Sequence, residues 1–138
     1  MAKVYNLFIS HSWSYSNQYD NLVGLLNQRG YFPFINYSVP RDDPVHTRGS
    51  DSVLYQAIKN KMTPCHVVII VAGVYASYSK WIDKEIQIAE TGFSLAKPIL
   101  AIRPWGNLNV SRVVSDAADR MVGWNTESVV SAIRELGV

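Results

Sequence analysis

The stretch His66-Val-Val-Ile-Ile-Val-Ala72 decides the fold of this chain. Its five central residues are all β-branched, and β-branched side chains favour extended backbone. The run does not alternate apolar with polar residues, so both faces of the strand need to be covered. A strand of this kind is typical of the centre of a parallel sheet. The stretch therefore predicts a parallel α/β domain.

Segments of alternating type extend from this strand in both directions. Further strands are predicted at 4–9, 31–35, 98–102 and 120–122, and helices at about 20–29, 51–61, 80–91, 110–118 and 127–136. Strands that alternate with helices over short connections form a parallel sheet with helices on both faces. Five strands in 138 residues favour the flavodoxin-like strand order 2-1-3-4-5. Pro33 suggests that the second strand lies at an edge.

Composition limits the class of protein. The chain is 48% hydrophobic and 17% charged, which allows a sizeable core and excludes intrinsic disorder. Its length fits a single domain over residues 1–138. No apolar run approaches the roughly 20 residues of a membrane span, and no signal peptide is recognisable. A single cysteine cannot form an internal disulfide, so nothing indicates an oxidising compartment. Together these features predict a cytoplasmic protein that does not bind membranes.

The charge is mildly basic, with a net value of +2 and a pI of about 8.7. Lys and Arg are scattered along the chain and form no run, whereas nucleic-acid-binding proteins cluster them. Nucleic acid is therefore not expected as the principal ligand, and no metal site is predicted.

One polar residue stands out in the helix predicted after the central strand. Trp81, Ile82, Glu85, Ile86 and Ala89 share one side of this helix, and four of the five are apolar. A carboxylate within a packing stripe is costly unless it is hydrogen-bonded or faces a cleft. Glu85 is thus either an edge residue that reaches solvent or a functional group.

Two motifs resemble those of TIR domains. Asn6-Leu-Phe-Ile-Ser10 is similar to their opening strand, and Ser79-Lys-Trp-Ile-Asp-Lys-Glu85-Ile86 contains their Trp-x-x-x-Glu motif after the third strand. Pro98-Ile-Leu-Ala-Ile102 matches their fourth strand, and the 36–49 loop lies where the family has its BB loop. The resemblance covers essentially the whole chain. It is strongest to compact bacterial TIR-like proteins, including the TIR subunit of Thoeris antiphage systems.

The resemblance implies an activity. In enzymatic TIR domains the glutamate of this motif cleaves NAD, so Glu85 is expected to be catalytic and NAD to be a substrate, with no separate cofactor. It implies an NAD glycohydrolase or ADP-ribosyl cyclase. The expected product is a cyclic ADP-ribose isomer or related conjugate that activates a separate effector during phage infection. The alternative is a catalytically silent TIR adaptor that acts by homotypic assembly.

The substrate pocket is expected among the loops after the first three strands. TIR enzymes often place arginines after the first strand, whereas this chain has Ser10, His11 and Ser12 before Trp13. Backbone amides, the Ser10 and Ser12 hydroxyls, or a basic residue such as Arg41 or Arg48 are candidates for binding the NAD phosphates. His11 is a candidate substrate contact. The side chain of Trp81 either stacks on nicotinamide or covers the sheet.

One carboxylate suffices for the chemistry. Nicotinamide leaves as a neutral molecule, so its departure needs no general acid, whereas ordinary glycosides require a pair of carboxylates. Glu85 would stabilise the developing positive charge on the ribose. The 36–49 loop is polar, so we expect a monomer or weak oligomer at rest that self-associates through this loop in response to a trigger, such as a phage component.

Other families with the same fold have different signatures. A phosphoacceptor receiver domain needs an acidic cluster after the first strand and an aspartate at the end of the third, where this chain has Ser10-His11 and Ala72-Gly73. A flavodoxin has threonine and glycine in its first loop, where serines dominate here. A nucleoside deoxyribosyltransferase also uses a glutamate at an anomeric carbon and is the nearest enzymatic alternative.

Overall fold

The computed structural model describes residues 3–10, 16–37, 51–72, 80–103 and 110–137. Three of these segments begin with a helix. For the first residues of those helices, 16–19, 51–54 and 80–81, the structure describes the backbone but not the side chains. The loops that follow β1, β2, β3 and β4 fall in the gaps between the described segments.

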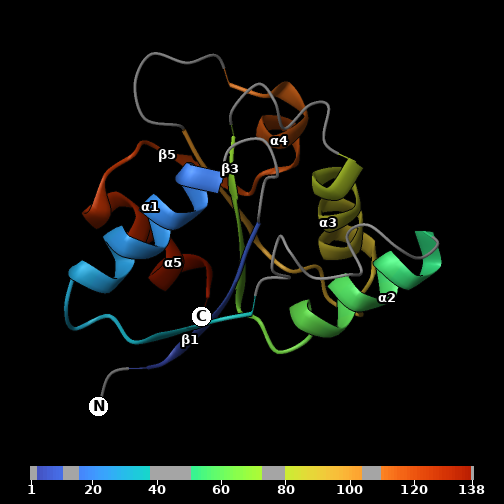
Figure 1. Cartoon of the computed structure of the whole chain (residues 1–138), viewed down its shortest axis with the longest axis horizontal. Coiled ribbons are helices and arrows are strands. Elements are labelled where there is room, and N and C mark those ends of the chain that lie inside the picture. The colour runs from blue at the N-terminus through green and yellow to red at the C-terminus, as the bar shows by residue number, and fades with distance from the viewer. Residues whose placement is uncertain (1–2, 11–15, 38–50, 73–79, 104–109, 138) are drawn as a thin grey trace.

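The molecule is built on a five-stranded parallel sheet (Figure 1). Its strands are β1 (Tyr5–Ile9), β2 (Phe34–Asn36), β3 (Val67–Val71), β4 (Ile99–Ile102) and β5 (Arg120–Val122). The order β2-β1-β3-β4-β5 confirms the predicted topology, including the edge position of β2. Every residue of β3 is buried, as expected for a continuous apolar strand in the middle of a parallel sheet.

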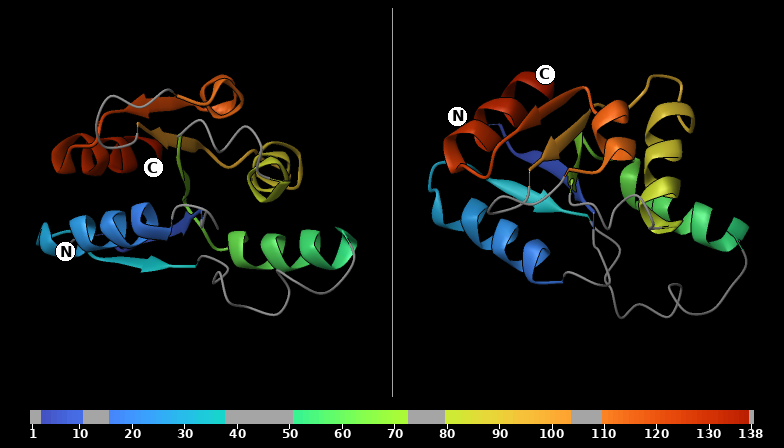
Figure 2. Two further views of the ribbon diagram at one scale, coloured as in Figure 1. Left: turned by 45° about the horizontal axis from the view of Figure 1, so that its top comes forward. Right: turned by 90° about the horizontal axis from the view of Figure 1, so that it is seen from above.

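Helices cover both faces of this sheet (Figures 1 and 2). The helices α1 (Ser16–Gln28) and α5 (Thr126–Leu136) pack on one face, which we call the α1/α5 face. The other, the α2/α3 face, is covered by α2 (Asp51–Met62), α3 (Lys80–Thr91) and α4 (Arg112–Ala117). The predicted α/β architecture with helices on both faces is therefore confirmed.

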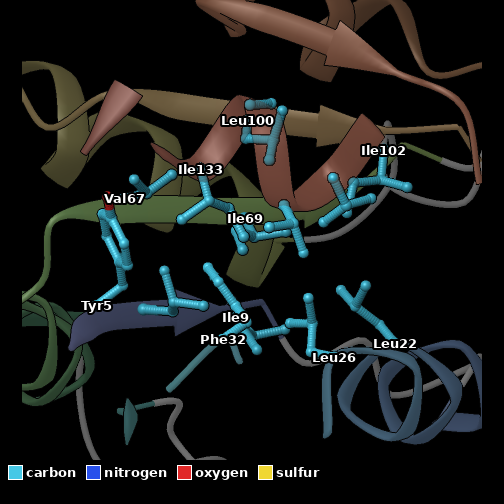
Figure 3. Packing of buried hydrophobic residues seen from close by; sticks show 14 of the residues in the cluster. Tyr5, Ile9, Leu22, Leu26, Phe32, Val67, Ile69, Leu100, Ile102 and Ile133 are labelled. Atoms are coloured by element: carbon cyan, nitrogen blue, oxygen red, sulfur yellow. The ribbon is translucent and has the colours of Figure 1, made fainter. Parts of the chain in front are cut away.

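The side chains of each strand alternate between these two faces. Ile9 and Ile69 belong to the core of the α1/α5 face, where Leu22 and Leu26 of α1 point toward them (Figure 3). Phe8, which lies between Leu7 and Ile9 in β1, belongs to the core of the α2/α3 face. This period of two fixes which face each later residue of β1 reaches.

Two element boundaries differ from the sequence prediction by more than two residues. The helix α1 begins at Ser16 rather than near residue 20, because its first turn is polar and gives no hydrophobic periodicity. The strand β2 begins at Phe34 rather than at residue 31, because Gly30 (φ 72°) and Tyr31 (φ 52°) both adopt the left-handed conformation and delay the extended backbone. Arg134 donates a hydrogen bond to the Tyr31 carbonyl at 3.2 Å and secures this turn.

Candidate functional site

Glu85 lies in the middle of the buried side of α3. Only 3% of its surface is exposed, and Ile82, Ile86 and Ala89 are buried beside it, as predicted. The buried side also includes Ile88, which lies beyond Glu85 around the helix at 100° per residue, so apolar side chains flank the carboxyl group on both sides. Asp83, Gln87 and Glu90 are exposed, as a solvated face should be. The structure therefore excludes the interpretation of Glu85 as an edge residue that reaches solvent.

Ser10 supplies a hydrogen bond to this carboxyl group. It directly follows β1 at the carboxyl end of the sheet, and its backbone N–H donates to the Ile69 carbonyl of β3 at 2.8 Å. Since Phe8 faces α2 and α3, the alternation of β1 sends the Ser10 side chain to the same face. There its Oγ donates a 2.6 Å hydrogen bond to Oε1 of Glu85. Two residues separated by 75 positions thus form a buried polar pair.

The surroundings of Glu85 change its acidity. Burial raises the pKa of Glu85 from 4.5 to about 8, and the hydrogen bond from Ser10 opposes part of this rise. In this conformation the side chain is mainly protonated at neutral pH. The carboxylate expected from the sequence is therefore the minor form here, because apolar surroundings penalise its charge.

A second buried serine strengthens the carboxyl edge of the sheet. Ser111 is fully buried, caps the N-terminus of α4 by accepting from the Val114 N–H, and donates its own N–H to the Ala72 carbonyl at 2.9 Å. Ala72 in turn donates to the Ile102 carbonyl at 2.8 Å. Ser111 was not predicted from the sequence. The available signal was a serine just before an apolar helical segment, which is a common N-cap pattern.

The other predicted site residues lie outside the described part of the chain. They are His11 and Ser12 after β1, Arg41 and Arg48 in the loop after β2, and the side chain of Trp81. Their proposed contacts with NAD therefore stay predictions. Among the predicted substrate-binding residues, Ser10 alone lies in the described structure, and it is paired with Glu85.

A cavity of about 440 Å³ lies elsewhere, among Asn27, Gly30, Tyr31, Phe32, Pro33 and Phe34. It adjoins the amino end of β2, which pairs with Tyr5 at the start of β1. Ser10 follows the other end of β1, roughly 16 Å away at about 3.3 Å per residue. Because ligands of open parallel sheets bind at the carboxyl ends of the strands, Ser10 and Glu85 mark the better candidate site.

The described residues contain no group of three or more His, Cys, Asp or Glu side chains placed to hold a metal ion. Within the same residues, no helix has the length and apolar character needed to cross a membrane. Burial raises the pKa of the Cys65 thiol to about 12, although Lys97 opposes the rise, so this thiol is protonated at neutral pH. Protonated thiols are poor nucleophiles, so Cys65 is not a candidate nucleophile.

Comparison with known families identifies the domain. Residues 8–109 match the profile of a family described as "Thoeris protein ThsB, TIR-like domain". This match covers well over half of the chain and includes both Ser10 and Glu85. The chain belongs to this family. The predicted resemblance to TIR domains and to the Thoeris branch is therefore confirmed.

Solved structures support the fold of the TIR-like domain. It is similar to the crystal structure of the SEFIR domain of IL-17 receptor B, with a TM-score of 0.61 over 97% of this chain and 95% of the receptor domain. Sequence identity between the two is 10%, so the likeness concerns the fold alone. The search among curated proteins found no match.

Proposed function

We propose that this TIR-like domain cleaves the nicotinamide–ribose bond of NAD, with Glu85 as the catalytic residue. The observation that carries the proposal is the burial of Glu85 beside the carboxyl end of β1, with Ser10 hydrogen-bonded to its Oε1 at 2.6 Å. A buried ionisable group with a strongly shifted pKa at the ligand-binding end of a sheet is a candidate for chemistry. Membership in a TIR-like family, some of whose relatives consume NAD, supports the same role.

The proposed reaction uses the charged form of Glu85. As nicotinamide leaves, positive charge develops on the ribose, and a nearby carboxylate stabilises it strongly in apolar surroundings. The nicotinamide ring of NAD itself carries a positive charge, and a cation close to a carboxyl group favours ionisation. We therefore expect bound NAD to lower the pKa of Glu85 from about 8 and to generate the active carboxylate.

The remaining parts of the proposal concern the substrate and the product. His11 and Ser12 contact NAD, and Trp81 stacks on its nicotinamide ring. The ribosyl cation is captured within the same molecule, so the product is a cyclic ADP-ribose-type nucleotide that activates a separate effector in antiphage defence. The 36–49 loop mediates self-association when a phage-derived trigger is present.

The direct test is incubation of the purified protein with NAD, followed by chromatography of the products. We expect NAD to be consumed, and a product with the mass of cyclic ADP-ribose distinguishes cyclisation from hydrolysis, which yields ADP-ribose. Glu85→Gln should lower turnover at least ~10²-fold, because it keeps the shape but removes the charge. Glu90→Gln is the matched control, since Glu90 is exposed on the same helix.

One observation favours a second candidate, a catalytically silent TIR adaptor that acts by homotypic assembly. With 3% of its surface exposed, Glu85 is closed to substrate in this conformation and could serve only to hold α3 against β1. An adaptor would leave NAD intact at every protein concentration. The same incubation, repeated across a range of concentrations with sedimentation to follow assembly, decides between the two functions.

A further inference from the structure

Ser10 and Glu85, which form a buried polar pair on the α2/α3 face, have different roles in the proposed reaction. Ser10 Oγ donates to Glu85 Oε1 at 2.6 Å, and 6% and 3% of the two residues are exposed. We propose that Ser10 is the positioning residue for Glu85, fixing its carboxyl group in the reactive orientation, and is not a ligand of the NAD phosphates. This inference rests on the proposed NAD cleavage and assigns Ser10 a different part in it.

Ser10 is anchored by its backbone to the paired strands β1 and β3. Its N–H donates to Ile69 of β3 at 2.8 Å, and the preceding residues Phe8 and Ile9 pair with Val68 and Ile69. A hydroxyl attached to this central strand pair has little freedom to move. Catalytic groups are best oriented by partners on such rigid elements, because small displacements of a reacting group are costly.

Glu85 needs a partner of this kind. Its carboxyl group is carried by a flexible side chain on α3, and its helix neighbours Ile82, Ile86 and Ala89 have no side-chain hydrogen-bonding atoms. A serine hydroxyl can donate to the ionised carboxylate and, after rotation, accept from the protonated acid. Ser10 can therefore hold Glu85 before and after it loses its proton.

The same contact argues against a phosphate-binding role. A serine hydroxyl has one proton to donate, and Ser10 donates it to Glu85. Phosphate oxygens at neutral pH are mainly acceptors and require donors. In the ionised form that the proposed reaction uses, Glu85 takes this proton, so Ser10 has none left to donate to a phosphate.

The test combines steady-state kinetics with a direct titration of Glu85. Ser10→Ala removes the hydroxyl and Ser10→Thr retains it, while Ser10→Cys preserves the size of the side chain if the alanine variant folds poorly. Ser131→Ala, at an exposed position of α5, is the control. Carbon-13 labelling of the four glutamates allows each carboxyl to be titrated by NMR, and the Glu85 signal is the one absent from Glu85→Gln.

We expect Ser10→Ala to lower kcat about 10- to 100-fold with little change in KM, which is the scale of one hydrogen bond to a charged group. Its Glu85 signal should titrate at higher pH than in the unmodified protein, because the lost hydrogen bond favoured the charged form. Ser10→Thr should restore both properties. Ser131→Ala should alter neither.

Two results would overturn the inference. If Ser10→Ala leaves the Glu85 titration unchanged, the serine does not act on the carboxyl group. If it raises KM and leaves kcat intact, Ser10 binds the substrate instead. Failure of the proposed function has a different signature, since the unmodified protein would then leave NAD intact, while the NMR titration still decides whether Ser10 controls Glu85.

Discussion

Each face of the sheet has a buried hydrophobic core, but the two cores differ in the polar groups that they enclose. The core of the α1/α5 face consists of apolar side chains such as Leu22, Ile69 and Ile133 (Figure 3). The α2/α3 face has an equally buried core around Phe8 and Ile70, yet it also encloses the hydrogen-bonded pair of Ser10 and Glu85. The second face therefore holds a buried carboxyl group, at a cost in stability. Such a cost is typical of functional sites.

The largest expected consequence of the buried carboxyl group on the α2/α3 face is a pH dependence of NAD cleavage. Only ionised Glu85 is proposed to be active, so activity should rise with pH until the pKa of about 8 is passed. Between pH 6 and pH 8, kcat/KM should increase roughly 50-fold, as the ionised fraction does. The midpoint for kcat should lie at lower pH, because bound NAD favours the charge. A flat kcat/KM profile over this range would contradict the role of Glu85.

The second difference concerns the stability of the folded protein as a function of pH. The folded-state pKa of Glu85 is raised, so between its ordinary value of 4.5 and about 8 the folded protein retains a proton that the unfolded chain releases. The free energy of unfolding must therefore fall as pH rises, by about 2 kcal/mol between pH 6 and pH 8. Urea denaturation at each pH measures it.

In the same titration, Glu85→Gln should lack this decrease and exceed the unmodified protein in stability at pH 8. Glu90→Gln, which alters an exposed carboxyl on the same helix, should retain the decrease. An equal slope in the Glu85 and Glu90 variants would show that another group titrates.

The smallest expected effect comes from the α1/α5 face. Ile133→Val removes one buried methyl group from α5 and should cost about 0.5–1.5 kcal/mol of stability. Since Ile133→Val removes no titratable group, the loss measured by urea denaturation should be the same at pH 6 and pH 8, and NAD cleavage should be unchanged. A loss that varied with pH would mean that the two faces are coupled.

Much of this architecture was accessible from local sequence. The β-branched run at 67–71 favoured a central strand, and the position of β5 at 120–122 was predicted without error. The boundaries failed where a local signal was weak, at the polar first turn of α1 and at Tyr31, whose left-handed backbone is uncommon for a non-glycine residue.

For the site, the sequence by itself determined that a carboxylate lies in an apolar helical stripe. Residues at i, i+1, i+4 and i+5 share a side of any helix, so Glu85 could be recognised beside Ile82 and Ile86 without coordinates. Only the tertiary structure decided what this carboxylate contacts. Ser10 is 75 residues away, and it meets Glu85 because β1 pairs with β3 in a register that carries its side chain beneath α3. The depth of burial, and with it the raised pKa, also arises from this packing, since desolvation depends on all surrounding groups and not on those nearby in the chain.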